Sequence, residues 1–233
     1  MKFQHKIAII GGLGPFAGAY AFERLLAHAN SVYGSFEDYE FPEIILHSIP
    51  FESTSCLGIE NDHSVRKALQ RSLLMLHEDG VQAALIACNS SHAFLPRLQI
   101  LHQVELISLV NAIKRPLLLV KGDTVSILSS RSSRACGVFT AVLKETGKRE
   151  SPLPEPLQAE VDDLINLSMK PILPPEAVQR LQALIKAVSA HGEHSVVIGC
   201  TELSRLFSRF EEPLPFVIDT LDEALRILLL KAL

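Results

Sequence analysis

The chain has 233 residues, of which 48% are hydrophobic, and a formal net charge of −4. This length suits one large domain or two small ones, and the apolar content is sufficient for a core. Charges are mixed, without a block of like charge or a basic stripe, which argues against nucleic acid and membrane surfaces and favours a small-molecule partner. The chain shows no signal peptide and no apolar stretch of membrane-spanning length, so we expect a soluble, cytoplasmic protein.

Short apolar runs rich in β-branched residues recur along the chain and are typical of buried parallel strands. These runs are residues 7–10, 44–47, 83–87, 104–107, 125–128, 196–198 and 216–218. Segments with helical spacing lie between them, at residues 17–30, 61–78, 92–102, 134–146, 157–169, 175–191, 202–210 and 219–230. Strands that alternate with helices predict an α/β fold with helices on both faces of parallel sheets.

The pattern between residues 111 and 121 looks helical but contains Pro116. Proline lacks a backbone N–H, so this helix should kink or end early, and we expect the chain to cross between domains there. The sequence predicts two similar Rossmann-like α/β domains with the active site in the cleft between them. The first domain comprises residues 1–112 plus 217–233 and carries Cys88, and the second comprises residues 113–216 and carries Cys200.

Two cysteines stand in matching positions, each after a predicted strand and before a predicted helix. Cys88 opens Cys88-Asn89-Ser90-Ser91-His92, and Cys200 lies in Gly199-Cys200-Thr201-Glu202. The N–H groups and dipole of a first helical turn stabilise a thiolate, so we expect lowered thiol pKa values at both positions. Ligands bind beyond the carboxyl ends of parallel strands, which predicts that both thiols face one cleft.

A facing pair of thiols fits the inversion of a carbon centre. Exchange of a proton at Cα needs a base on one face and an acid on the other, and a cysteine can serve as either. The charge of the carbanion must then be met by hydrogen-bond donors, for which Asn89, Ser90, Thr201 and the turn at residues 11–14 are the candidates. This is the chemistry of an amino-acid racemase without a cofactor.

At these residues the chain resembles the aspartate/glutamate racemase family, which is independent of pyridoxal phosphate. Three motifs carry the resemblance: Gly11-Gly12-Leu13-Gly14-Pro15, Cys88-Asn89-Ser90-Ser91-His92 and Gly199-Cys200-Thr201-Glu202. The resemblance implies two α/β domains with the active site between them, no cofactor or metal, and a homodimer. The chain is most similar to the aspartate racemase branch, because glutamate racemases have an acidic residue in the first motif and a histidine after the Cys-Thr pair of the last.

The resemblance also points to substrate anchors, with departures that bear on specificity. Lys170 aligns with a lysine that aspartate racemases use for substrate carboxylate. The family's arginine is missing from the Ile49–Thr54 region, where Glu52 stands, and Arg131 is its candidate replacement. Aspartate is the expected substrate, with broad-specificity or glutamate racemisation as alternatives. The full expected substrate-binding set is Gly12, Leu13, Asn89, Ser90, Ser130, Arg131, Lys170, Thr201 and Glu202, with His92 and Glu52 in supporting roles.

Other interpretations remain open. Cys88, His92 and Cys200 could supply three zinc ligands, and the two thiols could form a disulfide, although a reducing cytosol disfavours it. Gly12-Leu13-Gly14 with Gly18 suggests a nucleotide-dependent oxidoreductase, but the spacing is longer than that of the dinucleotide motif. A catalytically silent amino-acid-binding protein is a further alternative. The two remaining cysteines, Cys56 and Cys136, lack this context and are expected to be inert.

Overall fold

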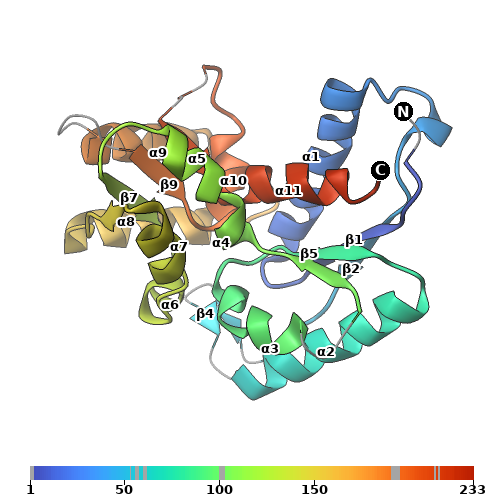
Figure 1. Ribbon diagram of the computed structural model, residues 1–233. Helices are drawn as coiled ribbons and strands as arrows, with labels where there is room; N and C mark the ends of the chain where they lie inside the picture. Colours follow the sequence, from blue (N-terminus) through green and yellow to red (C-terminus); the bar gives the residue numbers. More distant parts are fainter. Residues whose placement is uncertain are drawn as a thin grey trace.

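The computed structural model describes residues 3–52, 54–55, 58–59, 62–99, 103–189, 195–212, 214 and 216–233. The chain forms two α/β units, each built on a four-stranded parallel sheet (Figure 1). The predicted α/β class with parallel sheets is confirmed. Cys56 and the predicted helix ends at residues 61, 102 and 191 lie outside the described residues.

The first sheet has the strand order β2-β1-β5-β6. Its unit contains β1 (Ile7–Gly11), α1 (Pro15–Tyr33), the 3₁₀ turn η1 (Asp38–Glu40), β2 (Ile44–Ser48), β3 (Thr54–Ser55), β4 (Gly58–Ile59), α2 (Asp62–Glu78), β5 (Ala83–Ile86), the 3₁₀ turn η2 (Ser90–Phe94), α3 (Leu95–Gln99), β6 (Glu105–Ile107) and α4 (Leu109–Ala112). Strand β1 is completely buried because alternate residues face two cores: Ile7 and Ile9 pack under α1 and α11 (Thr220–Leu230), while Ala8 and Ile10 pack under α2 and α3.

The second sheet has the order β10-β9-β7-β8. Its unit contains α5 (Lys114–Leu119), β7 (Thr124–Leu128), α6 (Arg131–Ala135), α7 (Thr140–Thr146), β8 (Arg149–Glu150), α8 (Glu155–Ser168), α9 (Pro175–Ser189), β9 (Ser195–Ile198), α10 (Thr201–Phe207) and β10 (Val217–Asp219). Helices α8, α9 and α10 share a core with one face of this sheet, and α5 and α7 share a core with the other. Both sheets are therefore covered on both faces.

The chain crosses between the units twice. The predicted break near Pro116 is present, because the helix is divided at Ile113 into α4 and α5 and Pro116 lies in the first turn of α5, where its missing N–H costs no hydrogen bond. The return crossing comes after β10, which pairs with β9 in the second sheet, whereas the predicted boundary places residues 217–219 in the first domain. Helix α11 then packs against α1 and α4 of the first unit.

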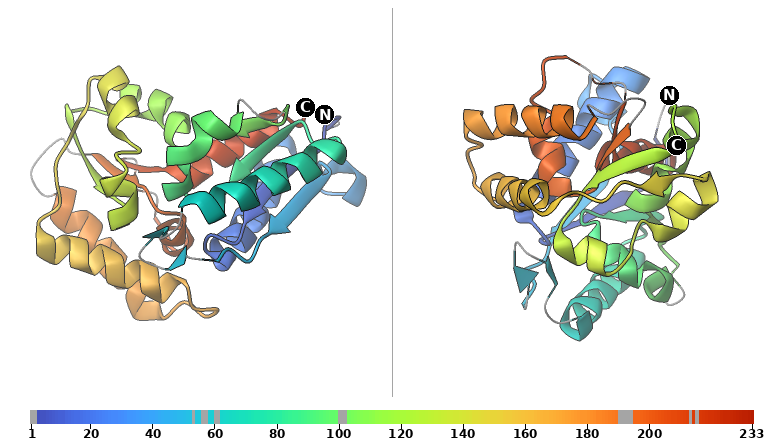
Figure 2. Two further views of the ribbon diagram at one scale, coloured as in Figure 1. Left: turned by 90° about the horizontal axis from the view of Figure 1, so that it is seen from below. Right: turned by 90° about the vertical axis from the view of Figure 1, so that its left-hand side faces the viewer.

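Local signals account for several boundaries. Asp219 caps α11 by accepting a hydrogen bond from the Leu221 N–H at 2.9 Å. Pro15 occupies the first turn of α1, and Gly147 ends α7 in the left-handed conformation. The two termini lie near each other at the far end of the first unit (Figures 1 and 2). In the described part of the chain, no helix has both the length and the apolar character needed to cross a membrane.

Candidate active site

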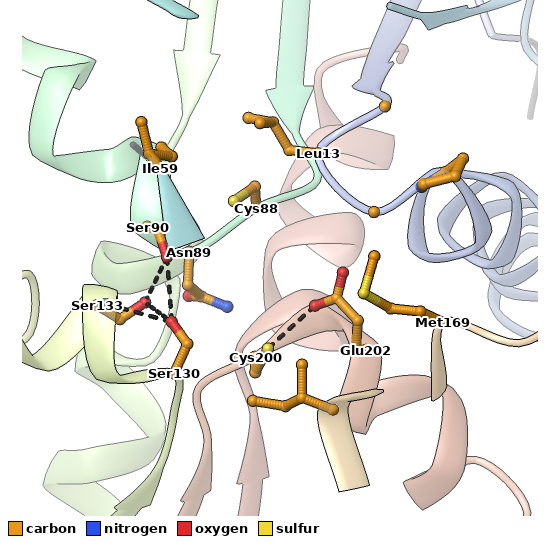
Figure 3. A pocket seen from close by; sticks show the side chains of 14 residues that line it. Leu13, Ile59, Cys88, Asn89, Ser90, Ser130, Ser133, Met169, Cys200 and Glu202 are labelled. Carbon is orange, nitrogen blue, oxygen red and sulfur yellow. Dashed lines mark hydrogen bonds between the residues drawn. The ribbon is translucent and has the colours of Figure 1, made fainter. Parts of the chain in front are cut away.

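Both motif cysteines lie two residues beyond a central strand, Cys88 after β5 and Cys200 after β9. The carboxyl ends of the two sheets face each other there, and a pocket of about 230 Å³ lies between them. Figure 3 shows Cys88 and Cys200 on opposite sides of this pocket. Its lining consists of Gly12, Leu13, Gly14, Pro15, Ile59, Cys88, Asn89, Ser90, Ser130, Ser133, Ile165, Met169, Cys200 and Glu202. The two thiols that the sequence pairs thus share one pocket.

The turn between β1 and α1 explains the glycine motif. Gly12 has a φ of +104°, and a Cβ there would lie 1.9 Å from the Ile49 carbonyl oxygen. Gly14 has a φ of +86°, and a Cβ there would lie 1.9 Å from Oε1 of Glu202. The positive φ of both glycines, the Ile49 backbone beside Gly12 and the Glu202 side chain beside Gly14 therefore account for the motif, without any need for a dinucleotide.

Glu202 controls the charge of the site. The thiol of Cys200 donates a hydrogen bond to Oε2 of Glu202 at 3.0 Å, and the hydroxyl of Thr201 donates to the same oxygen at 3.2 Å. Burial raises the pKa of Glu202. Among the described residues that line the pocket, Glu202 is the one with an ionisable carboxyl or basic side chain.

The expectation of lowered thiol pKa values is wrong. Burial first and the charge of Glu202 second raise the pKa of Cys88 to about 12, and the same two causes raise the pKa of Cys200 well above its usual value. The N–H groups of Ser90 and Ser91 lower the pKa of Cys88, as the motif predicts, but desolvation of the thiolate outweighs them. Both thiols are therefore protonated at neutral pH.

A cluster of buried serine hydroxyls lies at one end of the pocket (Figure 3). The Ser90 Oγ is 2.8 Å from that of Ser133 and 3.3 Å from that of Ser130, and the latter two are 3.2 Å apart. Ser130 also caps α6 by accepting a hydrogen bond from the Ser133 N–H. Ser90 comes from the first unit and the other two from the second, so the cluster joins the halves. Ser133 was not predicted, although the serine-rich run from Ser129 could have indicated it.

Asn89 supplies an unsatisfied acceptor to the same pocket. Its Nδ2 donates to Thr220 Oγ1 at 3.1 Å, while its Oδ1 is buried and has no hydrogen-bond partner. Buried polar atoms in native proteins nearly always have partners, so this oxygen is a position for a donor from a bound molecule. Thr201, which was predicted to bind substrate, lies outside the lining. Its hydroxyl lies 3.2 Å from the carbonyl oxygen of Ala87, so the segment that carries Cys200 contacts the segment that carries Cys88.

His92 has a structural position. Its Nε2 accepts a hydrogen bond from the Leu109 N–H at 2.8 Å, which requires the proton on Nδ1, and Nδ1 lies 2.9 Å from the Cys88 carbonyl oxygen. Burial lowers the pKa of His92 to about 4. Both ring nitrogens are thus engaged by the main chain, and within the described residues no group of three His, Cys, Asp or Glu side chains is placed to hold a metal ion. These contacts do not support the zinc interpretation.

Besides Thr201 and His92, three more expected residues lie outside the lining. Arg131 is exposed and forms ion pairs with Asp162, at 2.6 Å, and with Glu155. Helix α6 begins at Arg131, beside the serine cluster, but the guanidinium is held by these two carboxylates and not by the pocket. Lys170 and Glu52 are exposed and are not part of the lining. In their place the structure adds apolar residues that sequence reasoning missed, because nothing in the pattern shows which core residues border a cavity: Pro15, Ile59, Ile165 and Met169.

Comparisons with known proteins agree with this geometry. The family model described as Asp/Glu/Hydantoin racemase matches residues 10–228. The broad specificity amino-acid racemase RacX of Bacillus subtilis (strain 168) is 22% identical over 217 residues, which is 91% of each chain.

Solved structures show the same fold. Picrophilus torridus aspartate racemase superposes with a TM-score of 0.80 at 18% identity, over 98% of this chain and 94% of that one. An aspartate racemase homologue from Pyrococcus horikoshii OT3 gives a TM-score of 0.77 at 21% identity, over 98% and 99% of the two chains. Because the family model covers nearly the whole sequence, this chain belongs to the Asp/Glu/hydantoin racemase family, as its motifs predicted.

Proposed function

We propose that the protein interconverts the L- and D-enantiomers of an amino acid by proton transfer between Cys88 and Cys200 at Cα, without a cofactor. One observation carries the proposal: two thiols from the opposed ends of two sheets line opposite sides of a single pocket. A base and an acid on opposite faces of a carbon are what inversion requires. A single group that returned the proton to its own side would retain the configuration.

The step balances in protons and electrons. The thiolate of one cysteine takes the α-proton, and the electron pair of the C–H bond stays on Cα and spreads into the adjoining carboxylate. The thiol of the other cysteine then gives its proton to the opposite face and becomes the thiolate. The two cysteines have exchanged roles, so the enzyme is set for the reverse reaction.

The polar groups of the pocket have distinct parts in this reaction. The hydroxyls of Ser90, Ser130 and Ser133 are placed to donate to the substrate carboxylate, whose negative charge grows as the proton leaves. The substrate ammonium would meet Asn89 Oδ1 and the carboxylate of Glu202. A positive charge beside Glu202 offsets the field that raises both thiol pKa values, so substrate binding itself would favour formation of the thiolate.

The test is isotope exchange by purified protein in deuterated water, with each enantiomer of a candidate amino acid followed by NMR and chiral separation. Cys88→Ser and Cys200→Ser should each abolish racemisation, and each should retain α-proton exchange with one enantiomer only, of opposite hand in the two variants. Cys136→Ser is the matched control, because Cys136 is exposed and lies outside the pocket. Full racemisation by either pocket variant would overturn the proposal. So would tight binding of amino acids by the wild type without exchange, which would indicate a binding protein.

A further inference from the structure

The wall of the pocket around the two thiols is apolar. Leu13, Ile59, Ile165 and Met169 contribute side chains, and the described lining contains no lysine or arginine. The segment that brings Ile59 to the pocket, residues 48–61, also has no lysine or arginine anywhere in its sequence.

The arginines nearest in sequence to the lining are already engaged elsewhere. Arg134, which follows Ser133, donates a hydrogen bond to Oε1 of Gln158. Arg131 pairs with Asp162 and Glu155 on the exposed side of α6. Arg205 donates to the carbonyl oxygens of Ser168, Lys170 and Pro171, and its guanidinium lies 5.0 Å from the ring centre of Phe16. Lys170, which follows Met169, is exposed and lies outside the lining. A second substrate carboxylate would therefore find no cationic partner among the described lining residues.

The polar atoms of the pocket match only the invariant part of an amino acid. The serine cluster at one end suits the α-carboxylate, and Asn89 Oδ1 with Glu202 suits the ammonium. The side chain of the substrate is then left to contact the apolar wall formed by Leu13, Ile59, Ile165 and Met169. A neutral amino acid is a zwitterion and adds no net charge, whereas aspartate would add a negative charge to a buried site that already holds Glu202 and a thiolate.

Accepting the proposed two-thiol racemisation, we infer that the physiological substrate class is neutral amino acids with aliphatic side chains, not aspartate or glutamate. The side chain of the substrate packs against Leu13, Ile59, Ile165 and Met169. Ile59 and Met169, at the two sides of the pocket in Figure 3, are the specificity-determining residues.

The first experiment measures kcat/KM for α-proton exchange with L- and D-valine, leucine, methionine, aspartate and glutamate. At least one neutral substrate should exceed both acidic ones by about tenfold or more, which is the effect of one unfavourable charge contact. Equal or faster turnover of aspartate or glutamate would overturn the inference. If no amino acid exchanges, the two-thiol function fails. The affinities for leucine, methionine and aspartate, measured by calorimetry, then test the substrate class separately. Tighter binding of leucine or methionine than of aspartate would support the neutral, aliphatic class, and any other order, or no binding, would overturn it.

The second experiment places a cation in the apolar wall. Met169→Arg should raise the ratio of kcat/KM for aspartate over that for leucine by about tenfold or more, and Met169→Leu should keep the wild-type preference. Ile59→Arg repeats the test from the opposite side of the pocket, where Ile59 lies in the two-residue strand β4 and is partly exposed. Unchanged ratios in both well-folded arginine variants would overturn the assignment of this wall as the side-chain site.

Discussion

The thiol of Cys200 donates a hydrogen bond to the carboxylate of Glu202, with the sulfur and Oε2 3.0 Å apart. Glu202 thereby bears on both halves of the proposed reaction, because its charge raises the pKa of Cys200 directly and that of Cys88 across the pocket. Burial is the larger cause in each case. Burial and the charge of Glu202 thus both favour the protonated thiols.

Glu202→Gln should lower the pKa of both pocket thiols, although burial will still hold them above the usual value. At pH 8 a larger fraction of each would be thiolate, so alkylation by iodoacetamide should become faster at Cys88 and Cys200. Racemisation should nevertheless fall, since the ammonium loses its anchor. Peptide mass spectrometry measures all cysteines in one sample, with exposed Cys136 as the internal reference. Alkylation rates unchanged relative to Cys136 would contradict this account of the electrostatics.

Gly14→Ala should remove activity by displacing Glu202. The substitution strains a residue at φ +86° and places its Cβ 1.9 Å from Glu202 Oε1. Gly34→Ala is the matched control, because Gly34 also has a positive φ, +70°, but nothing lies within 4 Å of its Cβ position. Both variants should lose about 1 kcal/mol of stability from backbone strain. A kcat for Gly14→Ala as high as that of Gly34→Ala would show that the position of Glu202 does not matter.

His92 should make the protein less stable in mild acid. Burial lowers its pKa to about 4 from the ordinary 6.5, so between these values the unfolded chain binds a proton that the folded protein does not. The contribution of His92 to the free energy of unfolding is therefore complete above pH 6.5. It is lost as the pH falls toward 4, by up to about 1.4 kcal/mol per pH unit. Urea unfolding at pH 7 and 5 measures this loss. It should shrink in His92→Gln and persist in the exposed control His77→Gln; the same loss in both variants would assign it to other groups.

Arg131→Ala should leave the KM for any amino-acid substrate unchanged. The guanidinium is ion-paired with Asp162 and Glu155 outside the pocket, and exposed ion pairs contribute at most about 1 kcal/mol to stability. Steady-state kinetics with aspartate and leucine test this directly. A KM raised about tenfold for aspartate alone would show that Arg131 turns into the site when substrate binds.

Racemisation should survive dialysis against a chelator and treatment with hydroxylamine, because neither a metal nor pyridoxal phosphate is part of the proposed mechanism. Alkylation of the thiols should abolish it. Activity lost on chelation and restored by zinc would revive the metal interpretation, and would require His92 to give up the main-chain contacts of both ring nitrogens.

The sequence by itself determined the architecture and the pairing of the cysteines. Buried parallel strands consist of short apolar runs, and all seven predicted strands are present in the structure. The rule that ligands bind beyond the carboxyl ends of such strands was enough to predict that Cys88 and Cys200 share one site. The two-residue strands β3, β4 and β8 were missed, because none of them is a buried apolar run; in β8 both residues, Arg149 and Glu150, are charged and exposed. The homodimer, the cytoplasmic location and the domain boundaries stay predictions.

The tertiary structure decided the electrostatics and the shape of the site. The motif around Cys88 correctly indicates N–H groups that favour a thiolate, but the opposing cost of burial depends on what packs around the sulfur, which no local pattern contains. Likewise, the serine run around Arg131 marks a loop at the site, yet only the fold shows that Asp162 and Glu155 hold the arginine outside while Ile59, Ile165 and Met169 form the wall. Helix and strand periodicity is local, whereas desolvation, ion pairing and cavity lining are sums over residues distant in sequence.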